Sequence, residues 1–160
     1  MAEAGVVVSG ADRLDASGIV ALVARVFAEY GFVFDPATEV PDLVHFENHY
    51  EPPRGAFFAV RDGGLIVGSV GVEQLDPATA ELHRLYLDAY LRGQGTGRAL
   101  VEEVLGWCRA RAVSRLVLWS DTRFEQAHRL YERMRFRQTG ERTLPDDVNQ
   151  TREYLFERRV

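Results

Sequence analysis

The sequence predicts an α/β domain of the α+β type, with a mixed, mostly antiparallel sheet of about six or seven strands and about four flanking helices. Two observations predict the antiparallel strands and the helices. Short apolar segments follow one another through tight turns between Ala56 and Asp88, and a glycine-rich loop then leads into a helix with a 3.6-residue apolar period. A third observation is that only one clear β-α-β crossover can be drawn, which excludes a doubly wound parallel sheet.

The length and composition fit one domain spanning residues 1–160. A chain of 160 residues with 46% hydrophobic residues can bury a substantial core. The charged fraction of 27% is ordinary for a folded domain. We find no internal repeat, low-complexity segment or linker that would divide the chain.

The first third of the chain is expected to form one strand and two helices. Val6–Val8 is a short first strand. Asp15 or Ser17 can cap a helix that ends at Gly31 and whose apolar residues recur at helical spacing: Ile19, Leu22, Val23, Val26, Phe27 and Tyr30. Thr38 and Pro41 fit the cap and first turn of a short second helix that ends near His49-Tyr50.

A β-meander and a crossover unit follow. The expected meander strands are Ala56–Arg61, Leu65–Gln74 and Ala80–Asp88, joined by turns at Asp62-Gly63-Gly64 and Asp76-Pro77. After the glycine-rich loop we expect a helix over Arg98–Ala110, a buried strand over Arg115–Trp119 and a helix over Phe124–Met134. Two last strands, about Phe136–Leu144 and Arg152–Arg158, complete the sheet.

The loop itself, Arg92-Gly93-Gln94-Gly95-Thr96-Gly97, predicts an anion site. A glycine-rich loop that opens a helix presents free backbone N–H groups, and the helix dipole adds about half a positive charge there. A P-loop is excluded because no Lys-Ser/Thr follows Gly97. A dinucleotide-binding fold fits poorly because the preceding strands are antiparallel. A purely structural turn remains the alternative.

The loop and its surroundings resemble the GNAT superfamily of acyl-CoA-dependent N-acyltransferases. Arg92, Gly95 and Gly97 match its Arg-x-x-Gly-x-Gly pattern. The preceding segment Glu81–Asp88 looks like its fourth strand, Leu116–Trp119 looks like its fifth, and Ala127–Phe136 resembles its Ala-x-x-x-Tyr-x-x-x-Gly-Phe segment. The order of elements also matches, most clearly from Ala56 to the end.

The resemblance implies acetyl-CoA as cosubstrate and an amine, on a small molecule or a peptide, as acetyl acceptor. It places the diphosphate on Arg92, Gly93, Gln94, Gly95, Thr96, Gly97 and Arg98, and the pantetheine along Leu85, Tyr86 and Leu87. The amine would attack the thioester directly. A backbone N–H near Leu87 would stabilise the oxyanion, and Tyr131 would protonate the departing thiolate.

The base that deprotonates the amine is left open. Glu81 occupies a position where some family members carry a catalytic glutamate. Glu73, His83 and a chain of water molecules are alternatives. Glu81 and His83 point to one face of their strand and Arg84 to the other, provided that the strand has no bulge. The resemblance also assigns the segment that holds His45, His49 and Tyr50 to the acceptor groove.

Two residues depart from the family pattern. Arg135 stands where a glycine is usual, so a helix-ending turn must form without glycine, at a cost if its φ is positive. Phe124 stands where an asparagine is common, so an apolar contact replaces a polar contact to the cofactor.

Other classes of function are disfavoured. A net charge of −5 and a pI of about 5.4 disfavour nucleic-acid binding, and no apolar run approaches a membrane span. The single cysteine, Cys108, cannot form an internal disulfide. Met1–Gly10 lacks a secretory signal, which predicts a cytoplasmic protein. His45 and His49 lack the acid or thiol that would complete a metal site, so none is expected.

The resemblance makes a homodimer through the last strands an expectation. Two competing functions remain: a CoA-binding sensor that has lost acetyl transfer, and an interaction domain without a cofactor.

Overall fold

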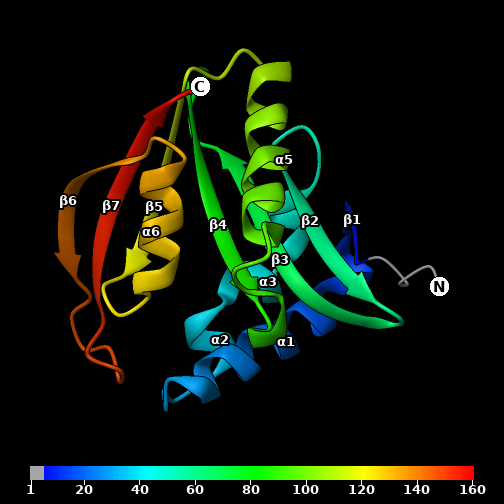
Figure 1. The fold of residues 1–160 in the computed structure, drawn as a ribbon, viewed down its shortest axis with the longest axis vertical. Helices are drawn as coiled ribbons and strands as arrows, with labels where there is room; N and C mark the ends of the chain where they lie inside the picture. The colour runs from blue at the N-terminus through cyan, green and yellow to red at the C-terminus, as the bar shows by residue number, and fades with distance from the viewer. Residues whose placement is uncertain (1–5) are drawn as a thin grey trace.

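The computed structural model describes residues 6–160, and its core is one seven-stranded sheet with the strand order β1-β2-β3-β4-β5-β7-β6 (Figure 1). Every neighbouring pair is antiparallel except β4 and β5. This confirms the predicted mixed, mostly antiparallel sheet with one crossover. Residues 1–5, part of the Met1–Gly10 segment considered for a leader, lie outside the described range.

The amino-terminal half forms β1 to β4 and the first four α-helices. The strands are β1 (Val7–Gly10), β2 (Gly55–Asp62), β3 (Leu65–Gln74) and β4 (Thr79–Leu87). A 3₁₀ turn, η1 (Arg13–Asp15), precedes α1 (Ala16–Glu29), and three short helices follow: α2 (Pro36–Glu39), α3 (Pro41–Val44) and α4 (Phe46–Tyr50). The single helix expected up to His49-Tyr50 is thus wrong, because the chain breaks helical geometry at Val40 and His45, whose ψ angles are 52° and 49°.

The carboxy-terminal half contains the crossover and the last hairpin. The elements are η2 (Ala89–Leu91), α5 (Thr96–Ala110), β5 (Arg115–Asp121), α6 (Glu125–Arg133), β6 (Arg137–Thr143) and β7 (Arg152–Arg159). α5 begins two residues before the predicted Arg98, because Gly95 already serves as its N-cap. The predicted strand pair at the end of the chain is confirmed as β6 and β7.

The helices cover both faces of the sheet (Figure 1). α5 and α6 pack on one face around a cluster that includes Leu100, Leu116 and Phe156, all nearly inaccessible to solvent. α1, α3 and α4 pack on the other face around Ile19, Leu43 and other apolar residues. The sheet, including β4 and β5 at its centre, is thus held between two buried apolar layers.

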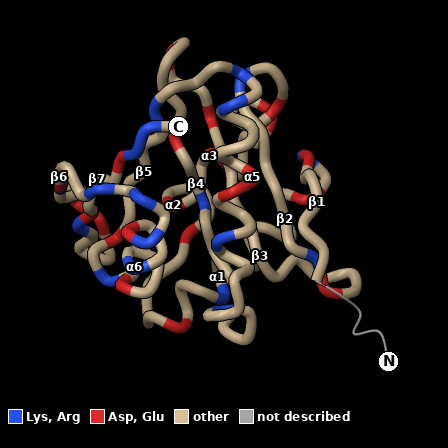
Figure 2. Tube along the Cα trace, turned by 45° about the horizontal axis from the view of Figure 1, so that its top comes forward, with Lys and Arg blue, Asp and Glu red and all other residues tan. Residues whose placement is uncertain are grey.

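Charge is unevenly distributed. All 19 basic residues are arginines, and the chain contains no lysine. Many of them lie along α6, β6 and β7, as the blue segments of Figure 2 show. Acidic residues lie among them, as the red segments there show, so this side of the molecule carries both signs of charge (Figure 2). Within residues 6–160 no helix is long and apolar enough to cross a membrane.

Candidate active site

The glycine-rich loop forms a turn that only flexible backbone adopts easily. Gly93 and Gly95 have φ angles of 75° and 86°, in the left-handed region that favours glycine. Gly95 is the N-cap of α5, so the N–H groups of Thr96, Gly97 and Arg98 begin the helix without acceptors inside it. A β-carbon at Gly95 would meet no atom within 4 Å. The loop therefore presents an open cluster of donors at the positive end of α5.

β4 and β5 are paired only at the start of β4. Their parallel register joins Thr79, Ala80 and Glu81 to Arg115, Leu116 and Val117, and no pair follows. Beyond Glu81 the two strands diverge, which leaves the β5-facing edge of β4 unpaired within the sheet. Asp88 donates its N–H to Val67 at 2.9 Å, so by antiparallel alternation the N–H of Leu87 points away from β3, into the gap.

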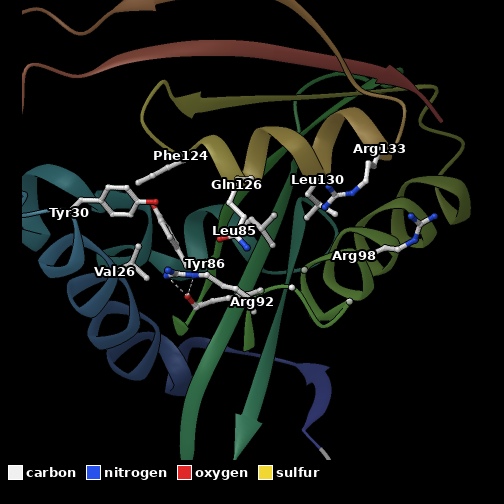
Figure 3. Close-up of a pocket in the computed structure, with 15 residues that line it drawn as sticks. Val26, Tyr30, Leu85, Tyr86, Arg92, Arg98, Phe124, Gln126, Leu130 and Arg133 are labelled. Atoms are coloured by element: carbon white, nitrogen blue, oxygen red, sulfur yellow. Dashed lines mark hydrogen bonds between the residues drawn. The ribbon is translucent and has the colours of Figure 1, made fainter. Parts of the chain in front are cut away.

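This gap opens into a first cavity of about 290 Å³ (Figure 3). Eight of the ten residues predicted to bind the cofactor line it: Leu85, Tyr86, Leu87, Arg92, Gly93, Gly95, Gly97 and Arg98. Val26 approaches from α1 and Tyr30 from the residue that caps its end, and Leu130 and Arg133 approach from α6. In Figure 3, Arg98 and Arg133 lie at one end and Tyr30 and Phe124 at the other. Gln94 and Thr96 are not among the lining residues; Gln94 instead donates to the Tyr90 carbonyl at 2.6 Å.

The Arg92 side chain is held by protein groups. Its guanidinium donates to the Leu87 carbonyl at 2.8 Å and pairs with Glu29 at 2.7 Å. These contacts tie the end of β4 to α1. Arg25 acts similarly, because it donates to both carboxylate oxygens of Asp88. Contacts of these two arginines thus hold the segment that leads from β4 into the glycine-rich loop.

A second cavity of about 370 Å³ lies beside the first. The two share Leu85, Tyr86, Phe124 and Ala127 in their linings, and Tyr131 lines the second. The predicted acid therefore lies in the second cavity, four residues along α6 from Ala127, which lines both. Tyr131 is 4% exposed, and its ring packs against Phe136 and Phe156 at centroid distances of 5.6 and 5.4 Å. Burial raises the pKa of the Tyr131 hydroxyl far above its usual range, and the neighbouring Tyr86 raises it further.

The candidate bases lie in this second cavity. Glu81, Glu73 and His83 all line it. The Glu73 carboxylate is 7% exposed and is already engaged by Arg54 at 2.6 Å and by His49 at 3.2 Å. Glu81 has no arginine partner among the described residues and lies 3.3 Å from the imidazole of His83. Of the three residues assigned to the acceptor groove, His49 lines this cavity, Tyr50 contacts its lining residue His83, and His45 is not among the lining residues.

β4 carries a bulge that sequence reasoning missed. Ser69 pairs with Tyr86 and Gly71 with His83, so Val70 opposes both Arg84 and Leu85. Arg84 has a φ of 55°, and the buried Ser69 hydroxyl donates to its carbonyl at 2.7 Å. The expectation that Arg84 and His83 point to opposite faces assumed a strand without a bulge, and this assumption is wrong. Arg84 reaches the same buried network as His83 instead of the opposite face.

That network contains a second group absent from the predicted site, Asp42 on α3. Arg84 donates to the two oxygens of Asp42 at 2.6 and 3.1 Å, and the Tyr50 hydroxyl donates to it at 2.5 Å. Burial raises the pKa of Asp42, but the Arg84 bonds and charge outweigh that effect, so the net pKa lies below the usual value. Asp42 precedes Arg84 by 42 residues, and only the fold brings them together.

The two departures from the family pattern have clear structural settings. Phe124 lines both cavities and packs edge-on against Tyr30 at 4.9 Å. Arg135 has a φ of 69° and ends α6 in a Schellman turn, in which Phe136 donates to the Tyr131 carbonyl and Arg135 to that of Glu132. The positive φ considered for Arg135 is therefore present.

Within residues 6–160 we find no group of three or more metal-ligating side chains.

Comparison with known proteins identifies the family. The model of the acetyltransferase (GNAT) family matches residues 22–136. N-acetylaspartate synthetase of Danio rerio is 34% identical over 120 residues, which cover 72% of this chain and 43% of that protein. A probable N-acetyltransferase family 8 member 5 of Mus musculus is 34% identical over 62% of this chain and 46% of that protein. The chain thus spans less than half the length of these two relatives.

Solved structures show the same fold. A GNAT-family acetyltransferase of Staphylococcus aureus superposes with a TM-score of 0.84 at 20% identity, covering 97% of this chain and 99% of that one. The ribosomal-protein-S18-alanine N-acetyltransferase of Escherichia coli superposes with a TM-score of 0.75 at 19% identity, covering 96% and 93%. The family match and the shared fold agree with each other. The chain belongs to the GNAT family of acetyltransferases.

Proposed function

We propose that this protein is an N-acetyltransferase that moves the acetyl group of acetyl-CoA to a primary amine by direct attack on the thioester. One observation carries the proposal. The gap between β4 and β5 opens, as one continuous cavity, onto the amino-terminal end of α5. A ligand with an extended amide arm and a diphosphate fits such a cavity, and coenzyme A has both.

The loop side of the cavity suits the diphosphate. Backbone N–H groups from Gly93 to Arg98 supply donors, and the open space beside Gly95 lets a phosphate approach the chain closely. Gln94 and Thr96 would contribute through their backbone only. The Arg98 guanidinium adds a positive charge at the same end of the cavity.

The strand side suits the pantetheine and the thioester. Leu85, Tyr86 and Leu87 form a strand edge to which the amide arm can add like a further strand. The N–H of Leu87 points into this gap and would stabilise the oxyanion of the tetrahedral intermediate. Tyr131 would then donate its proton to the thiolate as the carbon–sulfur bond breaks.

The second cavity is where the amine acceptor would bind. It adjoins the first through Leu85, Tyr86, Phe124 and Ala127, so an acceptor there can reach the thioester. Six carboxylates line it, and four of them are paired with arginines: Asp42, Glu73, Asp121 and Glu153. Glu39 and Glu81 have no arginine ion pair among the described residues, and these two carboxylates favour an amine that arrives as an ammonium ion, which must lose a proton before it attacks.

Calorimetry on Gly95→Asp tests the cofactor site. We expect the variant to lose measurable binding of acetyl-CoA, because an aspartate at this position places a carboxylate in the diphosphate site. Unchanged affinity would contradict the proposed site.

Gly63→Asp is the matched control. Gly63 also has a positive φ, 60°, but lies in the β2–β3 turn and lines neither cavity. The same backbone strain there should leave the binding of acetyl-CoA intact. A loss of affinity in both variants would point to destabilised folding instead.

A further inference from the structure

The acceptor cavity contains a chain of hydrogen bonds that ends on His83. The Asp42 carboxylate accepts from the Tyr50 hydroxyl at 2.5 Å, and the Tyr50 oxygen lies 3.0 Å from Nδ1 of His83. On the other side of the ring, Nε2 of His83 lies 3.3 Å from Oε2 of Glu81. Both His83 and Glu81 line the cavity, with about one fifth of each side chain exposed.

The chain fixes which imidazole nitrogen carries the proton. Arg84 keeps Asp42 ionised, so Asp42 can only accept, and it takes the single hydroxyl proton of Tyr50. The Tyr50 oxygen is then left as an acceptor for an Nδ1–H of His83. Neutral His83 therefore carries its free lone pair on Nε2, beside Glu81 and facing the cavity.

We infer that His83 is the general base of the reaction, that Asp42 and Tyr50 are positioning residues that hold its tautomer, and that Glu81 stabilises the protonated ring. The inference rests on the proposed acetyl transfer. Among the candidates that the sequence left open, it selects His83 over Glu81, Glu73 and a chain of water molecules. An ammonium ion in the cavity would donate to the Nε2 lone pair and to the Glu81 carboxylate, which lie close enough for both.

The proton balance is as follows. Nε2 of His83 takes one proton from the acceptor ammonium, and the freed nitrogen lone pair forms a bond to the thioester carbonyl carbon while the carbonyl π pair moves to oxygen. That pair returns as the carbon–sulfur bond breaks, and its electrons leave with sulfur. The sulfur takes the Tyr131 proton, and the new ammonium nitrogen returns one to Tyr131. His83 finally releases its proton to solvent.

The local packing supports a fixed position for Tyr50. Its ring contacts Phe46 and Phe57 at centroid distances of 5.1 and 4.9 Å, and Gly71 leaves the space that the ring occupies. A β-carbon at Gly71 would lie 2.7 Å from the Tyr50 ring. The charged and titratable groups around His83 come from four elements and are Asp42 on α3, His49 and Tyr50 on α4, Glu73 on β3, and Glu81 and Arg84 on β4.

The first test compares two amine acceptors in His83→Gln. With an alkylamine, which is charged near neutral pH, we expect kcat/KM to fall at least ten-fold and the acid limb of the pH–rate profile to move up towards the pKa of the amine itself, because only the fraction that is already neutral can then attack. With a weakly basic amine such as hydroxylamine or an alkoxyamine, which is already neutral, the loss should shrink to less than three-fold. An equal loss with both amines would overturn the base role.

Three further variants separate the roles. Tyr50→Phe should show a smaller loss than His83→Gln, again mainly with the alkylamine. His45→Gln, an exposed histidine outside both cavities, should behave as wild type. If Glu81→Gln, and not His83→Gln, shows the loss confined to the charged amine, Glu81 is the base and the inference is wrong. Failure of the wild-type protein to acetylate any amine would contradict the proposed function instead.

A spectroscopic test needs no turnover. The chain has four histidines, so ¹H–¹⁵N correlation of the imidazole rings can be assigned with His83→Gln. We expect neutral His83 in the Nδ1–H tautomer and a shift towards Nε2–H in Tyr50→Phe. An Nε2–H tautomer in the wild-type protein would contradict the inference.

Discussion

Tyr131 combines deep burial with a place in the lining of the second cavity. The same apolar packing that makes it look like a core residue also raises its pKa and keeps it protonated in the resting protein. A raised pKa makes the hydroxyl a weaker acid, so its proton would move late, as charge develops on the departing sulfur. In the proposed mechanism Tyr131 would thus be a proton donor that does not ionise before the reaction.

Tyr131→Phe isolates this role. The ring packing against Phe136 and Phe156 is retained, so we expect unchanged acetyl-CoA affinity by calorimetry and a turnover reduced at least ten-fold. Tyr154→Phe, on β7 and outside both cavities, is the control and should keep normal turnover. Undiminished turnover in Tyr131→Phe would remove it from the acid role.

Among the elements, α1 and α6 end in the same turn with different residues. At α1, Gly31 has a φ of 69° and Phe32 donates to the Phe27 carbonyl. At α6, Arg135 adopts the same φ of 69°. An L-residue in this region costs roughly 1–2 kcal/mol relative to a right-handed conformation, and glycine largely avoids that cost. The turn after α6 is therefore strained, whereas the turn after α1 is not.

Arg135→Gly should relieve this strain. We expect the free energy of unfolding to rise by about 0.5–1 kcal/mol, or roughly 1–4 °C in Tm, because the relief exceeds the entropy that glycine adds to the unfolded chain. Thermal and denaturant melts measure it. The converse substitution Gly31→Ala should lower the stability by about 1 kcal/mol. A lower Tm for Arg135→Gly would show that the arginine side chain stabilises the turn by more than the strain costs.

The elements differ in how well the sequence predicts them. The meander, the glycine-rich loop and the crossover were predicted correctly because their signals are local: turn residues, apolar periodicity and glycine spacing. The bulge at Arg84 has no such signal, since the residue is neither glycine nor proline and the bulge is held by Ser69 on the neighbouring strand. The breaks at Val40 and His45 likewise depend on packing of α3 and α4 beneath the sheet.

At the scale of the whole molecule, the two cavities differ in how far the sequence predicts them. β4, the glycine-rich loop and α6 supply most of the lining of the first cavity, which the sequence predicts closely because the family pattern lies there. The second cavity brings α3 and α4 next to β4, and its ion pair between Asp42 and Arg84 links residues far apart in sequence. Contacts of this kind follow from the fold and not from any local pattern.

The central claim is that an amine accepts the acetyl group of acetyl-CoA. The most direct measurement follows free thiol release by the purified protein with acetyl-CoA, with and without a panel of amines, and detects the acetylated amine by mass. The absence of lysine removes acetylation of its own lysines as a source of background. We expect thiol release that depends on the amine and matches the acetylated product mole for mole. Binding of acetyl-CoA without thiol release for any amine would contradict the claim and identify a sensor instead.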